Sequence, residues 1–327
     1  MDELSGKSGI FVHHWDTDGM CSAALLLREL KERAEVETFT PTIGNFYLDQ
    51  KDRKAIGEKN RDFVVVIDMA LPEESIEFLK ELGDVYIFDH HLQGKYDVCL
   101  HHNPVIDGKS ADEYPSASWV MGEYLGKEPD MLSILGSVGD REKKLLDNEK
   151  VMKKVNKVLQ RLNADFQTML EVVSLLDSSY KLGARDEVRK MPWFLMDLEE
   201  PSEILKRSDL RDNVRKLDSA IQAEVHAHID ETEPGVLYLE MESPYNIIST
   251  VTRQIAWANE DKIVVVVNDS FMEGNIQVYI RGPIPDSQSI IEAARDKGYS
   301  AGGKSDVVGM VIPDEDRGFI KTAMEML

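Results

Sequence analysis

Residues 63–91 have the sequence FVVVIDMALPEESIEFLKELGDVYIFDHH, which alternates a strand, a helix and a second strand. The first five residues, FVVVI, form an apolar run typical of a strand that is covered on both faces. Pro72 then begins a helix over EESIEFLKEL, and residues 85–88 form the next apolar strand. Two strands joined by a helix predict a parallel sheet with crossover helices.

The residues before and after this segment extend the same pattern. Residues 9–14, GIFVHH, form another short apolar strand, and residues 20–31 carry apolar residues at helical spacing. Residues 115–190 are mostly helical in pattern. We therefore expect an α/β fold in which a parallel sheet has helices on both faces.

The second half of the chain predicts a smaller α/β domain. Residues 191–211 interrupt the helical periodicity, and residues 212–230 have the pattern of one long helix. We therefore predict a first domain over residues 1–190, a linker with a connector helix over residues 191–230, and a second domain over residues 231–327. Within the second domain we expect strands at 236–241, 263–267, 276–281 and 307–312 and helices at 247–257, 289–297 and 318–327.

The composition limits the class of protein and the kind of metal site. Hydrophobic residues make up 42 % of the 327 residues, which is enough for two domain cores. No apolar run approaches the roughly 20 residues that span a bilayer, and residues 1–9 lack a signal-peptide pattern. We therefore expect a cytoplasmic protein without a membrane segment. The two cysteines, Cys21 and Cys99, form no C-x-x-C pair, so any metal must be held by oxygen and imidazole.

The net charge of −22 argues against a protein that coats nucleic acid, because binding to phosphates needs lysine and arginine. A nuclease is not excluded, since bound cations and a local basic cleft can supply the positive field at its site. The acidity then belongs to the outer surface. It would suit solubility, a salty cytoplasm or a basic protein partner, and the sequence does not choose among these.

Three successive strand ends carry side chains that can bind metal. The first continues into His14-x-Asp16-x-Asp18, the second into Asp68 and the third into Asp-His-His at residues 89–91. Sites in open α/β sheets form at the carboxyl ends of strands. Clustered carboxylates repel one another, and a bound cation removes that cost. Oxygen and imidazole ligands without a thiolate favour Mn²⁺ or Mg²⁺.

Each of these signals has a simpler explanation when it stands alone. A D-x-D-G turn is most often a loop or a helix cap, and an aspartate that ends a strand, such as Asp68, can cap the following helix. A histidine pair at a strand end is more often packing than ligation. His101 and His102 illustrate this, because they lie in a loop-like stretch and are interpreted as structural. Only the three strand ends together indicate a metal site.

Four motifs resemble, in order, those of the DHH phosphoesterase superfamily, which includes RecJ-like exonucleases, oligoribonucleases and family II pyrophosphatases. They are HWDTDGMCSA (14–23), Asp68 at its strand end, DHH (89–91) and GSVGD (136–140). The resemblance implies that the metal ligands are His14, Asp16, Asp18, Asp68, His90 and Asp140. Asp68 would bridge two ions, Asp89 would orient an imidazole, and His91 would contact the substrate phosphate or the leaving oxygen.

The second domain resembles the companion module of this superfamily, called DHHA1. Its signature is a glycine pair, a histidine and a further glycine, and this chain has Gly302, Gly303, Lys304 and Gly309. Lysine therefore replaces the usual histidine, although it can still bind a phosphate as a point charge. A glycine pair by itself is more often a turn. The resemblance implies that substrate phosphate is bound by Arg281, Gly302, Gly303 and Lys304, with Arg253 as a further candidate.

The activity that the resemblance implies is hydrolysis of nucleic acid phosphodiesters by two divalent ions about 4 Å apart. Histidine ligands favour Mn²⁺ over Mg²⁺. The H-x-D-x-D-G form is similar to that of archaeal RecJ-like nucleases, and the nearest branch is helicase-associated with 3′→5′ activity. We therefore expect a single-strand-specific exonuclease, leaning to DNA, in DNA repair or replication. Its partners would be single-stranded nucleic acid and a DNA helicase or replisome protein.

Two other functions fit the same motifs. An enzyme for very short substrates would hydrolyse nano-oligonucleotides, 3′-phosphoadenosine phosphates or cyclic dinucleotides. The second of these functions is that of a catalytically silent scaffold associated with a helicase. Loss of activity in such scaffolds usually accompanies loss of ligands, and in this chain every ligand of the four motifs is present.

Overall fold

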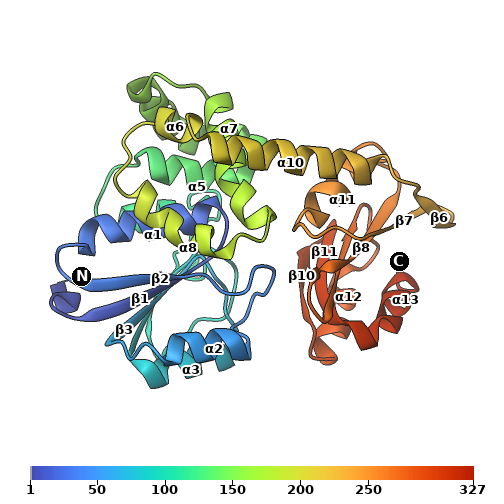
Figure 1. The fold of residues 1–327 in the computed structure, drawn as a ribbon, viewed down its shortest axis with the longest axis horizontal. Coiled ribbons are helices and arrows are strands. Elements are labelled where there is room, and N and C mark those ends of the chain that lie inside the picture. The colour runs from blue at the N-terminus through green and yellow to red at the C-terminus, as the bar shows by residue number, and fades with distance from the viewer. Residues whose placement is uncertain (1) are drawn as a thin grey trace. The chain divides into compact units, whose positions relative to one another are not determined.

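The computed structural model describes residues 2–327, which form two compact units (Figure 1). The first unit comprises Met1–Tyr180 and Ala184–Arg211, and the second comprises Lys181–Gly183 and Asp212–Leu327. The residues 191–230 predicted as linker and connector are therefore divided between the two units. The long helix expected at 212–230 is α10, which spans Ser208–Val225.

The first unit is built on a five-stranded parallel sheet of order β2-β1-β3-β4-β5. Its strands are β1 (Ser8–His13), β2 (Glu35–Phe39), β3 (Phe63–Ile67), β4 (Asp84–Phe88) and β5 (Leu100–His102). All five residues of β3 are buried, as expected for a central strand that is covered on both faces. The predicted parallel sheet is confirmed, and β2 extends it on one side and β5 on the other.

Helices cover both faces of this sheet, as the sequence predicts. Figure 1 shows α1, α5 and α8 on one face and α2 and α3 on the other. The helices of this part of the chain are α1 (Thr17–Leu30), α2 (Gln50–Gly57), α3 (Glu73–Leu82), α4 (Ala117–Tyr124), α5 (Met131–Arg141), α6 (Glu149–Leu162), α7 (Phe166–Lys181), α8 (Arg185–Leu195) and α9 (Ser202–Leu205). Short 3₁₀ segments lie at Asp2–Leu4 and Glu142–Asp147.

The interpretation of His101 and His102 as a loop is wrong. They form two of the three residues of the edge strand β5, which pairs with β4 through His101↔Ile87 and His102↔Phe88. A strand of three residues is too short to show a period of two in the sequence. Its hydrogen bonding to β4 decides its structure, and that pairing is a tertiary contact.

The second unit contains a six-stranded mixed sheet of order β10-β11-β9-β8-β7-β6, in which only the β7–β8 pair is parallel. Its strands are β6 (Asp230–Glu233), β7 (Val236–Met241), β8 (Ile263–Met272), β9 (Asn275–Arg281), β10 (Ser300–Lys304) and β11 (Val307–Pro313). The helices α10, α11 (Ile248–Trp257), α12 (Ser287–Asp296) and α13 (Gly318–Met324) accompany it, with a 3₁₀ turn at Asp314–Asp316. The sequence predicts four of these strands but not the short β6 and β10.

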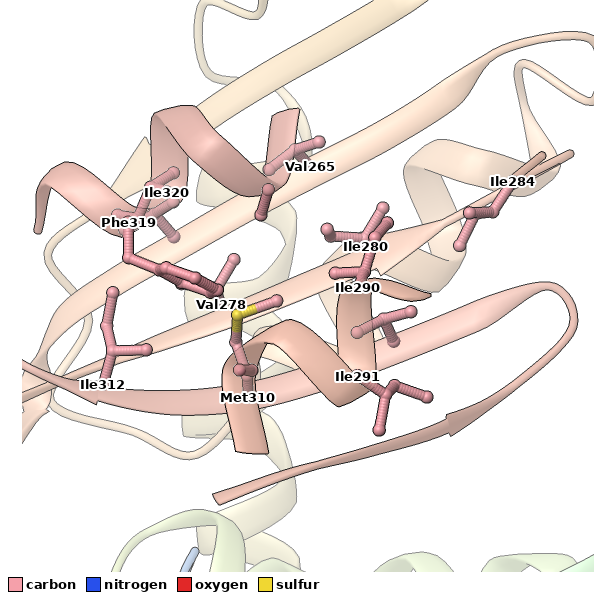
Figure 2. Packing of buried hydrophobic residues seen from close by; sticks show 14 of the residues in the cluster. Val265, Val278, Ile280, Ile284, Ile290, Ile291, Met310, Ile312, Phe319 and Ile320 are labelled. Carbon is pink, nitrogen blue, oxygen red and sulfur yellow. The ribbon is translucent and has the colours of Figure 1, made fainter. Parts of the chain in front are cut away.

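Apolar clusters on both faces hold the second unit together. Figure 2 shows residues from α12 and α13, such as Ile290 and Phe319, packed on Val278 and Met310 of the sheet. A second cluster joins α11 to the opposite face, where Val251 packs with β7 and β8. None of the described helices is long and apolar enough to cross a membrane.

Candidate metal centre

The register of the first sheet places its carboxyl ends side by side. Ile67 of β3 pairs with His13 of β1 and with Phe88 of β4, so the residue after each strand emerges at one edge. The backbone N–H of His14 donates to the carbonyl of Ile67 at 3.1 Å, and that of Asp68 donates to the carbonyl of Phe88 at 2.9 Å. This is the edge that the sequence predicts for the metal ligands.

Asp68 lies between two groups of ligands. Its side chain is 1 % exposed, and its backbone adopts φ of 59°, in the left-handed region. Oδ2 lies 3.7 Å from His14 Nδ1, and Oδ1 lies 3.6 Å from His90 Nε2. Neither oxygen has a hydrogen-bond partner among the described residues. A buried carboxylate whose oxygens face two imidazoles is suited to bridge two cations.

The first group consists of His14, Asp16 and Asp68, whose ligand atoms lie within 4.8 Å of one another. Asp16 caps α1, because its Oδ1 accepts from the backbone N–H of Gly19 at 3.0 Å, while its Oδ2 lies 2.8 Å from His14 Nδ1. Burial opposes ionisation, but the neighbouring His14 lowers the pKa of Asp16 to about 2. A Cβ at Gly19 would lie 2.5 Å from the carbonyl oxygen of His14, so the turn requires glycine.

The second group consists of Asp18, His90 and Asp140. His90 Nε2 lies 2.9 Å from Asp140 Oδ2 and 4.0 Å from Asp18 Oδ2. The carboxylate of Asp18 is fully buried and accepts from the backbone N–H groups of Ala117 at 2.6 Å and Ser118 at 2.9 Å. The N-terminus of α4 therefore fixes the orientation of this ligand.

Asp89 and His91 form a hydrogen-bonded pair and make, with Asp68 and His90, a third group whose candidate ligand atoms lie within 4.8 Å of one another. Asp89 is fully buried, and its Oδ1 accepts from His91 Nδ1 at 2.7 Å and from the backbone N–H of His90 at 2.7 Å. The amide of Gln93 donates to its other oxygen. The side chain of His91 is 49 % exposed. Its opposite ring nitrogen, Nε2, can therefore face a substrate.

The charges of the cluster shift its pKa values in the directions that a cation site requires. Burial and the nearby carboxylate of Asp18 raise the pKa of Asp68 well above its ordinary value. Burial and Asp140 raise the pKa of Asp18 to about 7. Burial alone would lower the pKa of His91, but Asp89 raises it to about 9. The carboxylates of Asp18 and Asp68 are thus poorly compensated by the protein alone, and a divalent cation would supply the missing positive charge.

The donor set fits divalent cations. Nε2 of His14 and both oxygens of Asp68 are buried without a hydrogen-bond partner in the described part of the chain. Buried polar atoms are normally satisfied, so several in one place indicate a ligand. The six predicted metal residues all belong to the two groups, and the set contains no thiolate. Oxygen and imidazole donors of this kind suit Mn²⁺ or Mg²⁺.

Two residues support this site through contacts that the sequence does not predict. Gly136 lies one helical turn before Asp140 in α5, and a Cβ there would overlap Ser118 Oγ and Asp18 Oδ1. Asp177 of α7 accepts from the backbone N–H of Thr17 at 3.0 Å and from its hydroxyl at 2.6 Å. Both contacts join residues that are distant in the chain. Gly136 belongs to the GSVGD motif, but the motif does not indicate which side chains the glycine faces.

Three of the candidate substrate residues of the second unit, Arg281, Gly302 and Lys304, lie on one face of its sheet. Lys304 pairs with Val307, which pairs with Arg281, and directly paired residues share a face. Arg281 Nη2 lies 3.7 Å from Asp306 Oδ2. Gly302 lies two residues before Lys304 in the same strand, so it is on the same face. A Cβ at Gly302 would meet no atom within 4 Å. The position above Gly302 is therefore open, and Lys304 and Arg281 carry the cationic side chains of the same face.

The glycine pair is not a turn, because Gly302 and Gly303 lie within β10. Gly303 faces the other side, where a Cβ would overlap the carbonyl oxygen of Val307. Arg253 belongs to α11, and its guanidinium lies 5.4 Å from the centroid of the Trp257 ring. The helix packs against the face that carries Tyr279.

Comparisons with known proteins agree with this geometry. Residues 8–147 match the model of the DHH family, N-terminal domain. The fold is similar to RecJ of Thermus thermophilus in complex with Mn²⁺ (TM-score 0.70, 18 % identity), covering 99 % of this chain and 52 % of that chain. This chain therefore spans about half the length of that protein.

Two further structures are similar over most of both chains. An exonuclease RecJ bound to manganese has a TM-score of 0.69 and 17 % identity, covering 98 % of this chain and 90 % of that chain. The pGpG-specific phosphodiesterase PggH from Vibrio cholerae has a TM-score of 0.52 and 16 % identity, covering 97 % of each chain. No curated protein matches the chain by sequence. The family match and the strand-end cluster identify residues 8–147 as a domain of the DHH family, and the chain as a whole has a RecJ-like fold.

Proposed function

We propose that this chain hydrolyses phosphodiester bonds in nucleic acid with two divalent cations, Mn²⁺ in preference to Mg²⁺. The observation that carries the proposal is the placement of Asp68, whose two buried oxygens face His14 on one side and His90 on the other. A carboxylate in this position would hold two cations at one phosphate. His14 and Asp16 would complete the first site, and the second group would complete the other.

When bound, the two cations would ionise a water and offset charge on the phosphate oxygens. Asp68 would contribute a ligand to both cations, and α4 holds Asp18 in a fixed orientation in which it could bind one of them. Asp89 orients the ring of His91 through Nδ1, so that Nε2 donates a hydrogen bond to a phosphate or leaving oxygen. Asp89 and His91 therefore act on the substrate side of the site and leave ligation to the other six residues.

The proposed substrate is single-stranded DNA, degraded from one end in the 3′→5′ direction, in DNA repair or replication in the cytoplasm. The RecJ-like fold supports an exonuclease, because one structure of this fold is described as an exonuclease RecJ bound to manganese. The preference for single strands follows from the resemblance to RecJ-like nucleases. The polarity and the helicase or replisome partner follow from the resemblance of the H-x-D-x-D-G form to archaeal nucleases. In the second unit, Arg281, Lys304, Gly302 and Gly303 would bind substrate phosphates, with Arg253 in support.

A very short substrate is the second candidate. The phosphodiesterase PggH, described as pGpG-specific, is similar in fold over 97 % of this chain and 97 % of its own. A protein of this size can therefore be an enzyme for dinucleotides. Under this alternative the same metal residues act, and the substrate is a nano-oligonucleotide, a 3′-phosphoadenosine phosphate or a cyclic dinucleotide.

One degradation assay separates these candidates. Single strands of DNA and RNA, labelled at the 5′ or the 3′ end, and a dinucleotide would be incubated with Mn²⁺ or Mg²⁺. We expect one-nucleotide steps from the 3′ end of DNA, fastest with Mn²⁺. Turnover of the dinucleotide alone would favour the second candidate. Absence of hydrolysis on every substrate and with both metals would contradict the proposal and favour the helicase-associated scaffold.

A further inference from the structure

An exposed aromatic ring lies beside the first group of metal ligands. The ring of Phe46 is 6.0 Å from that of His14 between centroids, with planes 23° apart, and 5.3 Å from the ring of Trp15. Trp15 is 4 % exposed, but Phe46 is 55 % exposed. The outer face of the Phe46 ring is therefore open to solvent, and its inner face lies next to the ring of His14, a predicted metal ligand.

The loop that carries Phe46 is held in place on both sides. The backbone N–H of Thr42 donates to Asp52 Oδ2 at 3.0 Å, and the Thr42 hydroxyl donates to Asp49 at 2.9 Å. Ile43 and Leu48 on either side of Phe46 are buried, at 5 % and 1 % exposure. The exposure of Phe46 thus does not come from a loose loop. A phenylalanine kept in water on a fixed loop forfeits favourable burial, which a ligand could restore.

We propose that Phe46 is a stacking platform for the base of the nucleotide next to the scissile phosphate. The proposal rests on the proposed function, because it takes the substrate phosphate to bind between His14 and His90. Stacking on an aromatic ring is tolerant of base identity, since every base has a π-face. Phe46 would therefore make the site select phosphodiesters that carry a base, without choosing among bases.

The structure also provides a competing role, in which Phe46 only packs on Trp15 and keeps His14 in position. The two roles differ in what the substitution changes. A packing role needs an apolar side chain, which Phe46→Leu retains. A stacking role needs an aromatic ring, which Phe46→Tyr and Phe46→Trp retain. If Phe46 only packs and positions His14, its loss should weaken metal binding. If Phe46 stacks on a base, its loss should weaken the recognition of substrates that carry the base.

The test measures kcat and KM on a dinucleotide and on the same dinucleotide with an abasic residue at either end. For Phe46→Ala and Phe46→Leu we expect KM on the natural dinucleotide to rise about tenfold, with kcat within about twofold. One of the two abasic substrates should show no such rise. Phe46→Tyr and Phe46→Trp should behave as wild type. Leu146→Ala is the matched control, because Leu146 is also an exposed apolar residue, at 48 %.

A binding experiment keeps the inference separate from the proposed function. The dinucleotide would carry 2-aminopurine, whose fluorescence is quenched on stacking, and would bind to Asp68→Asn with or without Phe46→Ala. Quenching that disappears with Phe46→Ala supports the platform even if the wild-type protein shows no turnover. Three outcomes would overturn the inference. The first is quenching that Phe46→Ala leaves unchanged, and the second is a Phe46→Leu variant that is as active as wild type. The third is a Phe46→Ala variant that binds Mn²⁺ more weakly and has the same rise in KM on natural and abasic substrates.

Discussion

Asp68 is the residue in which the demands of stability and function conflict most clearly. It is buried, takes a left-handed backbone conformation and has no hydrogen-bond partner for either oxygen among the described residues. Burial and the neighbouring carboxylates raise its pKa well above the ordinary value. A charged group under these conditions destabilises the metal-free protein. The same features make it available to two cations.

We therefore predict that Asp68→Asn abolishes metal-dependent hydrolysis but stabilises the metal-free protein at pH 8. Asparagine has the same shape, tolerates positive φ and carries no charge. The pKa of Asp68 in the folded protein exceeds the unfolded value of 3.8, so the folded state favours the protonated carboxyl. Asp68 therefore costs the protein no stability at low pH, and it lowers the free energy of unfolding as the pH rises and the carboxyl ionises. The advantage of Asp68→Asn in thermal melts with EDTA should consequently shrink as pH falls towards 4.

Two outcomes would contradict this prediction. One is a melting temperature of metal-free Asp68→Asn below that of wild type at pH 8. The other is wild-type turnover by the variant with a native far-UV circular dichroism spectrum, which would end the assignment of Asp68 as a bridging ligand.

At the scale of the elements, the second group of ligands depends on how three helices meet. α4 presents its first backbone N–H groups to Asp18, and α5 brings Asp140 to His90. α5 can approach α4 and α1 so closely because residue 136 has no side chain. The helices therefore determine the positions of ligands that no strand end supplies.

We predict that Gly136→Ala weakens metal binding and lowers kcat at least tenfold. Alanine stabilises a helix by about 1 kcal/mol relative to glycine, but here its Cβ would overlap the carboxylate of Asp18. Gly122→Ala in α4 is the control, because its Cβ would meet only Ser133 Oγ, at 3.2 Å. Isothermal titration with Mn²⁺ would measure the affinities. Equal affinity of Gly136→Ala and Gly122→Ala would show that this packing does not position Asp18.

At the scale of the whole molecule, the six predicted metal ligands and His91 belong to the first unit, and the other residues predicted to bind phosphate belong to the second. Ligand binding stabilises the state that carries the site. Mn²⁺ should therefore slow amide hydrogen exchange in β1, β3 and β4. Exchange in β8 and β9 should not change. Equal protection of both sheets by Mn²⁺ would contradict this division.

The contribution of the second unit can be tested at Lys304, which replaces the usual histidine of the module. If it binds a substrate phosphate as a point charge, Lys304→Ala should raise KM about tenfold and change kcat less. Lys304→Arg should restore most of the affinity. Because the contact is electrostatic, the difference between wild type and Lys304→Ala should shrink at high salt. An unchanged KM would remove Lys304 from the substrate site.

Much of the first unit could be predicted because its central strands are uniformly apolar. β3 and α3 have the predicted bounds, and the predicted ligands His14 and Asp68, together with Asp89, follow directly from where the strands end. The short strands β2, β5, β6 and β10 could not be predicted. Each has three to five residues, and pairing with a neighbour decides its conformation more than its own composition does.

The order of apolar and acidic residues by itself determined the parallel sheet and the edge at which its metal ligands gather, because hydrophobic burial places the strands and their carboxyl ends share one side. Only the tertiary structure decided which ligands group together, that Asp68 faces both groups, and that Gly136 makes room for Asp18. Those features depend on contacts between residues far apart in the chain. Local sequence periodicity carries no information on such contacts.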